Sequence, residues 1–328
     1  MDGVGEPTLV DKEHTTGLRS ESQAMRNPVK IQWRLSRRSV GYLMIAPAVI
    51  FLLVAIGYPI FDIIRTSLFK YEGLRDQTST FVGLGNFVEL MDDKIFWTSA
   101  KNTISFTLAS IVGHLILGGV FALALHQKWF SERLRNIVRG LLILPWLFSL
   151  AAAALIWALL LNTMGPLNYI FQELGWIDGP LDFLGERDSA IWALVLINVW
   201  KAYPFYMIMI LGGLQSIPLD VYDAAKVDGA NRSQNFWYIT LPLIRDVLVA
   251  ATAIDFITTF GVFDIVRILT SGGPARTTLT LGYYTWSVGF RDVDFGYGAA
   301  ISVLMLVTVA IGALVYLRIA SRKESVYA

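Results

Sequence analysis

The chain has 328 residues, of which 55% are hydrophobic and only 16% are charged. A soluble domain usually carries about a quarter charged residues, so this composition disfavours a soluble protein. The net charge of +1 provides no field for nucleic acid, and the absence of cysteine excludes disulfides, thiolate zinc sites and cysteine nucleophiles. The only histidines are His14, His114 and His126, too few and too scattered for a histidine-based metal site.

Residues 1–40 are polar and contain no apolar core, so we expect a cytoplasmic N-terminal tail rather than a cleavable signal peptide. The first 29 residues mix glycine, serine, threonine and charges of both signs, which is typical of disorder. A second cytoplasmic tail is expected at residues 321–328. Residues 41–320 are predicted to form one transmembrane domain.

Long apolar stretches predict the membrane spans. Four segments of more than about 20 residues contain no Asp, Glu, Lys or Arg, and about 20 apolar residues cross a bilayer core. Two further apolar segments carry charges: one contains Lys201, and the other contains Asp255, Asp264 and Arg267. The predicted fold is therefore an all-α integral membrane bundle of six transmembrane helices, at about 41–69, 99–126, 138–161, 190–214, 243–269 and 297–319.

The charges of the loops predict the orientation. The segments before the first helix, after the second and after the last are mainly basic: Lys30, Arg34, Arg37 and Arg38; Lys128, Arg133, Arg135 and Arg139; Arg318, Arg322 and Lys323. The loops between them, about 70–98 and 162–189, are rich in Asp and Glu. Because basic loops stay in the cytoplasm, we expect both termini and the loop at 215–242 to be cytoplasmic.

Residues 216–242 of that loop carry clear local signals. Ser216 can cap a helix, and Pro218 fits a first helical turn. We expect a short helix through Val227 or Asp228, ended by Gly229 in a left-handed conformation. A second short helix, at about 232–238, then leads back into the membrane.

The same loop resembles the EAA signature of ABC importer permeases. The matching residues are Asp223-Ala224-Ala225, then Asp228-Gly229-Ala230, and Ile239-Thr240-Leu241-Pro242. The spacing of the signature, three residues before the glycine and nine after it, is kept throughout. The one departure is Asp223, where the signature has glutamate, and it shortens the reach of the carboxylate by one methylene.

Further segments resemble the first permease of maltose-type transporters. They are Phe81–Phe87 with Asn102-Thr103, Asp264 with Leu269–Pro274, and Gly296–Ala300. The resemblance implies a carbohydrate importer in the bacterial cytoplasmic (inner) membrane. In such importers two different permeases form the pathway, two ATPase subunits dock on the EAA loops, and an extracytoplasmic binding protein delivers the solute.

The chain has no G-x-x-x-x-G-K-[ST] phosphate loop. We therefore expect a transport subunit that is not an enzyme and has no cofactor, with ATP and Mg bound by the partner ATPase. The resemblance implies that the ATPase docks on six residues of the loop: Asp223, Ala224, Ala225, Asp228, Gly229 and Ala230.

The resemblance also implies a solute pocket on the fourth and fifth helices. Its candidate residues are Asn198, Lys201, Ala202, Phe205, Asp255, Thr258, Thr259 and Val262. Lys201 and Asp255 both fall near mid-membrane, where ionisable residues are costly and usually functional. They either pair structurally or contact the solute, and their charge leaves an anionic or modified sugar open.

Other classes fit the sequence less well. A membrane-embedded transferase needs convergent catalytic groups, whereas these helices hold isolated charges. A channel or secondary transporter would place charges in several helices and would not need the EAA-like loop. Within the importer class, the alternative is a permease for a peptide, an amino acid or a phosphate ester.

Overall fold

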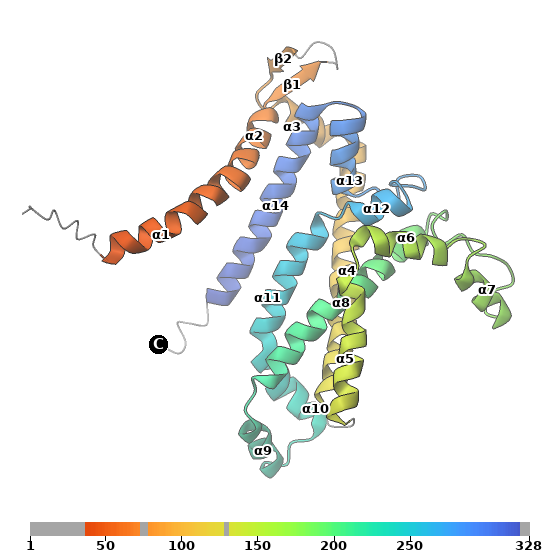
Figure 1. The fold of residues 1–328 in the computed structure, drawn as a ribbon. Coiled ribbons are helices and arrows are strands. Elements are labelled where there is room, and N and C mark those ends of the chain that lie inside the picture. The colour runs from red at the N-terminus through yellow and green to blue at the C-terminus, as the bar shows by residue number, and fades with distance from the viewer. Residues whose placement is uncertain (1–36, 73–77, 128–130, 322–328) are drawn as a thin grey trace, which may run out of the picture. The chain divides into compact units, whose positions relative to one another are not determined.

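The computed structural model describes residues 37–72, 78–127 and 131–321 (Figure 1). The chain divides into two units, residues 1–58 and residues 59–328. The two expected tails fall mostly outside the described residues, and so does Lys128. The disorder expected for the first 29 residues therefore stays a prediction.

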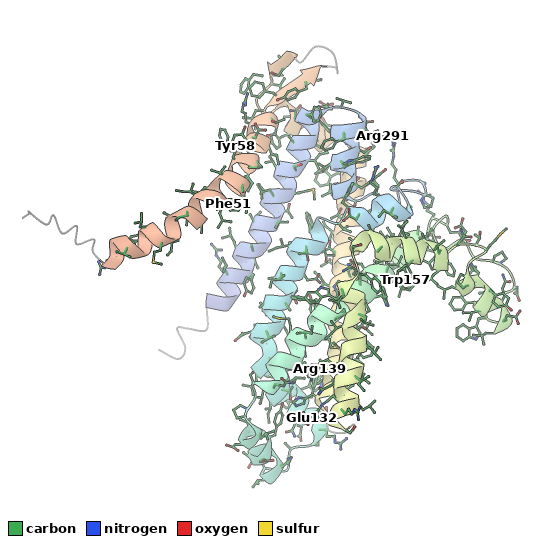
Figure 2. The ribbon with its side chains drawn as sticks, viewed as in Figure 1. Phe51, Tyr58, Glu132, Arg139, Trp157 and Arg291 are labelled. Carbon is green, nitrogen blue, oxygen red and sulfur yellow. The ribbon has the colours of Figure 1, made fainter. Side chains whose placement is uncertain are left out.

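The first unit is helical throughout its described part. It contains α1 (Arg37–Leu52) and the π-helical turn η1 (Leu53–Gly57), and the helix continues into α2 (Tyr58–Thr66). Its apolar side chains, Phe51 and Leu53 among them, are exposed on all sides, with Phe51 and Tyr58 labelled in Figure 2. A helix that is apolar all round belongs in a protein core or a membrane. The first predicted span, 41–69, therefore corresponds to a helix that ends at Thr66 and not at residue 69.

The second unit carries a β-hairpin at one end of its helical bundle. Strands β1 (Phe69–Glu72) and β2 (Thr78–Phe81) are antiparallel, and Phe69 lies opposite Phe81. Asn86, in the short helix α3 (Gly85–Asp92), anchors the hairpin, because its side-chain amide donates to the carbonyls of Ser67 and Phe69.

The centre of this unit is the pair α4 (Lys94–His126) and α8 (Ala190–Gln215), which pack along each other (Figure 1). Glycines on α4 permit the close approach. A Cβ at Gly118 would lie 2.9 Å from the backbone nitrogen of Met207 and 2.9 Å from the carbonyl oxygen of Tyr203. The backbones of the two helices therefore touch at this point, as small residues allow in membrane bundles.

The predicted span at 138–161 is not one straight helix. It is two helices, α5 (Glu132–Leu147) and α6 (Leu150–Leu160), which meet at an angle of 96°. Pro145 in the last turn of α5 removes a backbone donor. Ser149 then starts the new helix, since its hydroxyl accepts a hydrogen bond from the nitrogen of Ala152 at 3.1 Å. Figure 2 shows Trp157 on α6 beyond the bend and Glu132 and Arg139 on α5 before it.

The predicted span at 243–269 is also broken. Helix α11 (Leu241–Phe260) ends at Gly261, and α12 (Asp264–Leu269) starts three residues later. Asp264 and Arg267 therefore lie on α12, outside the long helix that was expected to contain them. The last span, α14 (Phe295–Ser321), matches its prediction closely, as does α8.

The remaining elements are short helices and π-helical turns. They are α7 (Pro166–Glu173), α9 (Leu219–Val227), α10 (Arg232–Gln234), η2 (Asn235–Thr240), α13 (Leu281–Trp286) and η3 (Ser287–Arg291). In the described part of the chain, four single helices and the bent α5–α6 pair are long and apolar enough to cross a membrane. Helix α11 is not among them, because it carries Arg245, Asp246 and Asp255. The predicted class, an all-α membrane bundle, is confirmed.

Candidate functional site

The coupling loop, residues 216–242, projects from the bundle at the end opposite the hairpin (Figure 1). Helix α9 ends at Val227, and Gly229 has a φ of +79°, so the left-handed glycine is confirmed. The nitrogen of Ala230 donates to the carbonyl of Ala225 at 2.9 Å, and that of Gly229 donates to the carbonyl of Lys226 at 3.1 Å. These two bonds form a Schellman motif.

The start of α9 differs from the prediction. Pro218 is the N-cap residue, with an extended ψ of 138°, and lies just before the first helical turn. Ser216 does not cap α9, because it ends α8 and its hydroxyl donates to the carbonyl of Gly213 at 2.8 Å. A serine between two successive helices can bond the end of the first helix or the start of the second. The sequence alone does not decide between these two roles.

The second arm of the loop is fixed by side chains. Asn231 and Gln234 form a reciprocal capping box, with bonds of 2.9 and 2.8 Å. The helix expected at about 232–238 does not stop there, since α10 runs through η2 into α11. The Tyr222 hydroxyl lies 3.0 Å from that of Thr240 and ties α9 to this arm.

A hollow of ≈ 280 Å³ opens between the two arms. It is lined by Asp228, Gly229, Ala230, Gln234, Tyr238 and Ile239. Beside it, Tyr238 is 78% exposed and Val227 is 88% exposed. Two large side chains are thus exposed at or next to a concave surface.

The two alanines of the signature differ in their surroundings. Ala224 is exposed, whereas Ala225 is buried against this chain. The Asp223 carboxylate accepts a hydrogen bond from Lys226 Nζ at 2.7 Å, and both side chains are about two-thirds exposed. A cation on a docking partner would therefore compete with Lys226 for Asp223.

Asp255 lies in the C-terminal half of α11, with only 5% of its surface exposed. Its Oδ2 atom is 2.7 Å from Nδ1 of His114 and accepts a hydrogen bond from the Tyr206 hydroxyl at 3.1 Å. Its Oδ1 atom accepts from the Thr259 hydroxyl at 2.7 Å. These four residues, here called the His114–Asp255 network, join α4, α8 and α11.

His114 is fully buried, and its second ring nitrogen, Nε2, lies 3.1 Å from the backbone carbonyl oxygen of Asn198. Because a carbonyl only accepts, Nε2 carries a hydrogen and donates it. Nδ1 faces the Asp255 carboxyl group at 2.7 Å, so the two ionisable residues are paired with each other. Ionisable residues inside a membrane bundle are tolerated when they are paired in this way.

Sequence reasoning missed His114, which it considered only as a metal ligand. The rule applied to Lys201 and Asp255, that an ionisable residue inside a membrane span is functional or paired, selects His114 equally well. What the sequence lacked was the partner, since the two residues are 141 positions apart.

Lys201 lies apart from this network. Its Nζ atom donates to the carbonyl of Trp146 at 3.3 Å, near the end of α5, and the side chain is partly exposed. The described residues therefore contain no Lys201–Asp255 ion pair. Two aromatic pairs join this stretch of α8 to the bend between α5 and α6: the ring centroid of Phe205 is 6.2 Å from that of Trp146, and Trp200 stacks on Phe148 at 6.3 Å.

The other predicted pocket residues have different surroundings. Asn198 is buried, and its Nδ2 atom has no hydrogen-bond partner in the described part of the chain. Ala202 is half-buried, one residue beyond Lys201. The exposed Thr258 donates back to its own helix, and Val262 is buried where α11 ends. The structure thus gathers Asp255, Thr259 and the backbone carbonyl of Asn198 around His114, whereas Ala202 and Phe205 neighbour Lys201 along α8.

The segments that resembled maltose-type permeases meet at the other end of the bundle. The Asn102 amide donates to the carbonyls of Arg276 and Leu279, at 2.8 and 3.0 Å. Both residues follow shortly after Gly272-Gly273-Pro274. The Thr103 hydroxyl accepts a hydrogen bond from the nitrogen of Leu281 at 2.8 Å. The Asn102-Thr103 motif is thus bonded to the residues that follow Leu269–Pro274, about 175 positions away in sequence.

Asp93 holds a second polar cluster at this end. Its carboxylate accepts hydrogen bonds from the hydroxyls of Tyr284 and Tyr297, at 2.6 and 2.9 Å, and from the nitrogen of Ile95. Burial alone would raise the pKa of Asp93, but these hydrogen bonds outweigh burial and leave the pKa below its usual value. The pKa of the Tyr284 hydroxyl is raised by burial and by the neighbouring carboxylate.

Comparison with known proteins identifies the family. The profile of the binding-protein-dependent transport system inner membrane component family matches residues 114–325. The chain belongs to this family. The permease is therefore the inner-membrane component of a transport system that depends on a binding protein, as the EAA-like loop predicted.

The relatives span the whole permease. It is 35% identical to the trehalose/maltose transport system permease of Thermococcus litoralis over 90% of this chain and 98% of that protein. It is also 35% identical to the sulfoquinovosyl glycerol transport system permease of Agrobacterium fabrum, over 88% and 93% of the two chains. A crystal structure of a bacterial alginate ABC transporter, bound to a periplasmic protein carrying an alginate pentasaccharide, contains a chain of the same fold. That chain is 22% identical, has a TM-score of 0.75, and the match covers 87% of this chain and 95% of that one.

Proposed function

We propose that this permease forms half of the translocation route of an ATP-driven importer for a sugar or sugar-like solute, which an extracytoplasmic binding protein delivers. The observation that supports this solute class most strongly is the full-length similarity to two permeases named for sugar solutes. We prefer it to import of a peptide, an amino acid or a phosphate ester for that reason.

The second half of the route is a different permease, and two ATPase subunits supply the energy. In this proposal the ATPase binds the coupling loop, with Val227, Tyr238 and the hollow beside them as its contact surface. ATP and Mg bind to the ATPase, and the permease itself holds no cofactor. Closure of the ATPases would push on α9 and α10 and rock the bundle between its two access states.

Solute passes along α8, on the side of Lys201 and Phe205. Aromatic rings offer flat apolar faces to a sugar ring, and amide and ammonium groups offer donors to its oxygens. The His114–Asp255 network fixes the position of α8 relative to α4 and α11. Its oxygens are already bonded, so we assign it to holding the helices and not to contact with solute.

Transport by reconstituted parts tests the proposal. The permease, its second permease, the ATPase and the binding protein would be purified and placed in proteoliposomes. Uptake of a labelled sugar is expected only with ATP and the loaded binding protein, and not with the single chain. Loading of the binding protein by amino acids or peptides, and by no sugar, would contradict the solute class. Uptake by the single chain would contradict the subunit role.

The orientation has its own test, because the chain contains no cysteine. We propose that both termini and the coupling loop are cytoplasmic. Cysteine placed at the exposed Asn231 is expected to react with an impermeant maleimide only after the cells are opened. Cysteine at the exposed Lys70 in strand β1 is expected to react in intact cells. The reverse pattern would overturn the orientation.

A further inference from the structure

Lys201 carries a charge that no acidic side chain in the described part of the chain neutralises. Asp255 is the acid that the sequence offered as its partner. Its two oxygens are occupied by His114, Tyr206 and Thr259, and it forms its ion pair with His114. The contact that Lys201 does make is with a neutral carbonyl, that of Trp146.

The position of Lys201 makes this charge significant. It lies about 11 residues along α8 from Ala190, roughly 17 Å along the helix axis. A partly exposed ammonium at that depth is not stable against lipid tails, and such residues face a water-filled cavity or the bundle interior. The partly exposed ammonium is therefore expected to face the water-filled transport route, where an acidic group from outside this chain can neutralise it.

The surroundings of the ammonium suit a sugar that bears an acidic group. Phe205 follows one turn after Lys201, with its ring 6.2 Å from that of Trp146, and both rings are at least partly exposed. One turn before, Asn198 is buried, and its amide Nδ2 has no partner among the described residues. Aromatic faces bind a sugar ring, an amide donates to a ring oxygen or hydroxyl, and an ammonium pairs with a carboxylate or sulfonate.

We infer that the solute is an anionic sugar and that Lys201 binds its acidic group on the way through the membrane. This inference rests on the proposed function of sugar import. The sequence left open whether Lys201 and Asp255 pair with each other: Asp255 pairs with His114, and no acidic side chain in the described part of the chain pairs with Lys201.

A structural explanation competes with this one. Trp146 is in the last turn of α5, and a lysine near a helix C-terminus stabilises its unbonded carbonyls. A lysine that acts only as a cap would not distinguish neutral from acidic solutes. An acid from the second permease would also neutralise Lys201 without any part played by solute.

The experiment has two arms. First, the purified binding protein is titrated with matched neutral and acidic sugars, such as glucose and glucuronate, galactose and galacturonate, and their disaccharides. Tighter binding of an acidic member is expected. Binding of a neutral member in its place overturns this inference but leaves sugar import intact, whereas binding of amino acids alone overturns the proposed function itself.

Second, uptake of the acidic sugar is measured in proteoliposomes with wild-type permease and its Lys201 variants. Lys201→Gln is expected to lower uptake efficiency roughly tenfold or more, the usual effect of losing a hydrogen bond between charged groups, and Lys201→Arg to retain most of it. Lys70→Gln removes the same charge from an exposed strand and serves as the control. Equal uptake by the Lys201→Gln and Lys70→Gln variants overturns the inference, provided that detergent-purified complexes of both are equally stable.

Discussion

The His114–Asp255 network and the coupling loop are both polar regions of an apolar chain, but they leave their polar atoms in opposite states. In the network, each ring nitrogen and each carboxylate oxygen has a partner, and the four residues are at most 7% exposed. In the coupling loop, local backbone bonds fix the shape, while Asp228, Val227 and Tyr238 face solvent. The network, with its polar atoms bonded, holds three helices together, whereas the loop leaves polar and apolar groups exposed, as our proposal of ATPase docking requires.

Single changes in the network are expected to have the largest effect. His114→Ala or Asp255→Ala leaves one buried ionisable group without its partner, which destabilises proteins by about 3–5 kcal/mol. We expect sharply reduced yield and a lower unfolding temperature in detergent for each. The double variant is expected to be less destabilised than the sum of the two single variants. Additive losses would show that the pair is not coupled and would remove the contrast with the coupling loop.

Gly229→Val comes next, and it acts on the open region alone. A valine at a φ of +79° costs roughly 1 kcal/mol or more, although no atom lies within 4 Å of the position that a Cβ would occupy. We expect normal yield and unfolding temperature for the bundle, with loss of ATPase pull-down and of ATP hydrolysis stimulated by the binding protein. Gly212→Val, in α8 with similar open space around it, is the matched control. Normal pull-down and hydrolysis with Gly229→Val would mean that this turn does not couple transport to ATP.

The two signature alanines separate docking from folding. Ala224→Trp places a large group on the exposed side of α9 and is expected to reduce ATPase pull-down several-fold without changing the unfolding temperature of the permease. Ala225→Trp is expected to lower both, because Ala225 is only 7% exposed and overpacking costs about 1–3 kcal/mol. The same two measurements serve for both variants. Equal thermal effects would show that the two positions are not distinct.

Asp93 lies between these extremes, partly exposed and bonded to two tyrosines, and its variants are expected to have the smallest effect. Asp93→Asn should lower stability by about 1 kcal/mol at neutral pH, because it weakens hydrogen bonds to a charged acceptor. The pKa of Asp93 is lower in the folded protein than its usual value, so folding favours the ionised form. The difference between wild type and variant is therefore present at neutral pH and shrinks as the pH falls below about 4. Thermal unfolding of both proteins over that pH range measures it, and a difference that grows on acidification would contradict the sign.

The sequence predicted most of what depends on neighbouring residues. Gly229 ends a helix in the left-handed conformation, which glycine adopts easily because it has no Cβ. The type of this one residue and its place after the helix were enough to predict its conformation. The spans at α4, α8 and α14 follow from apolar length alone. The bend between α5 and α6 was signalled by Pro145 and Ser149, but the run of apolar residues across them masked the break.

Contacts between distant segments were beyond such reasoning. The sequence predicted that Lys201 and Asp255 lie near mid-membrane, because counting residues along a helix gives a distance along its axis. Whether they meet depends on the rotation and packing of α8 against α4 and α11, which the glycines at 113 and 118 allow to approach closely. That packing places His114 against Asp255 and leaves Lys201 with a backbone carbonyl, because hydrogen-bond partners are set by positions in space and not by distance along the chain.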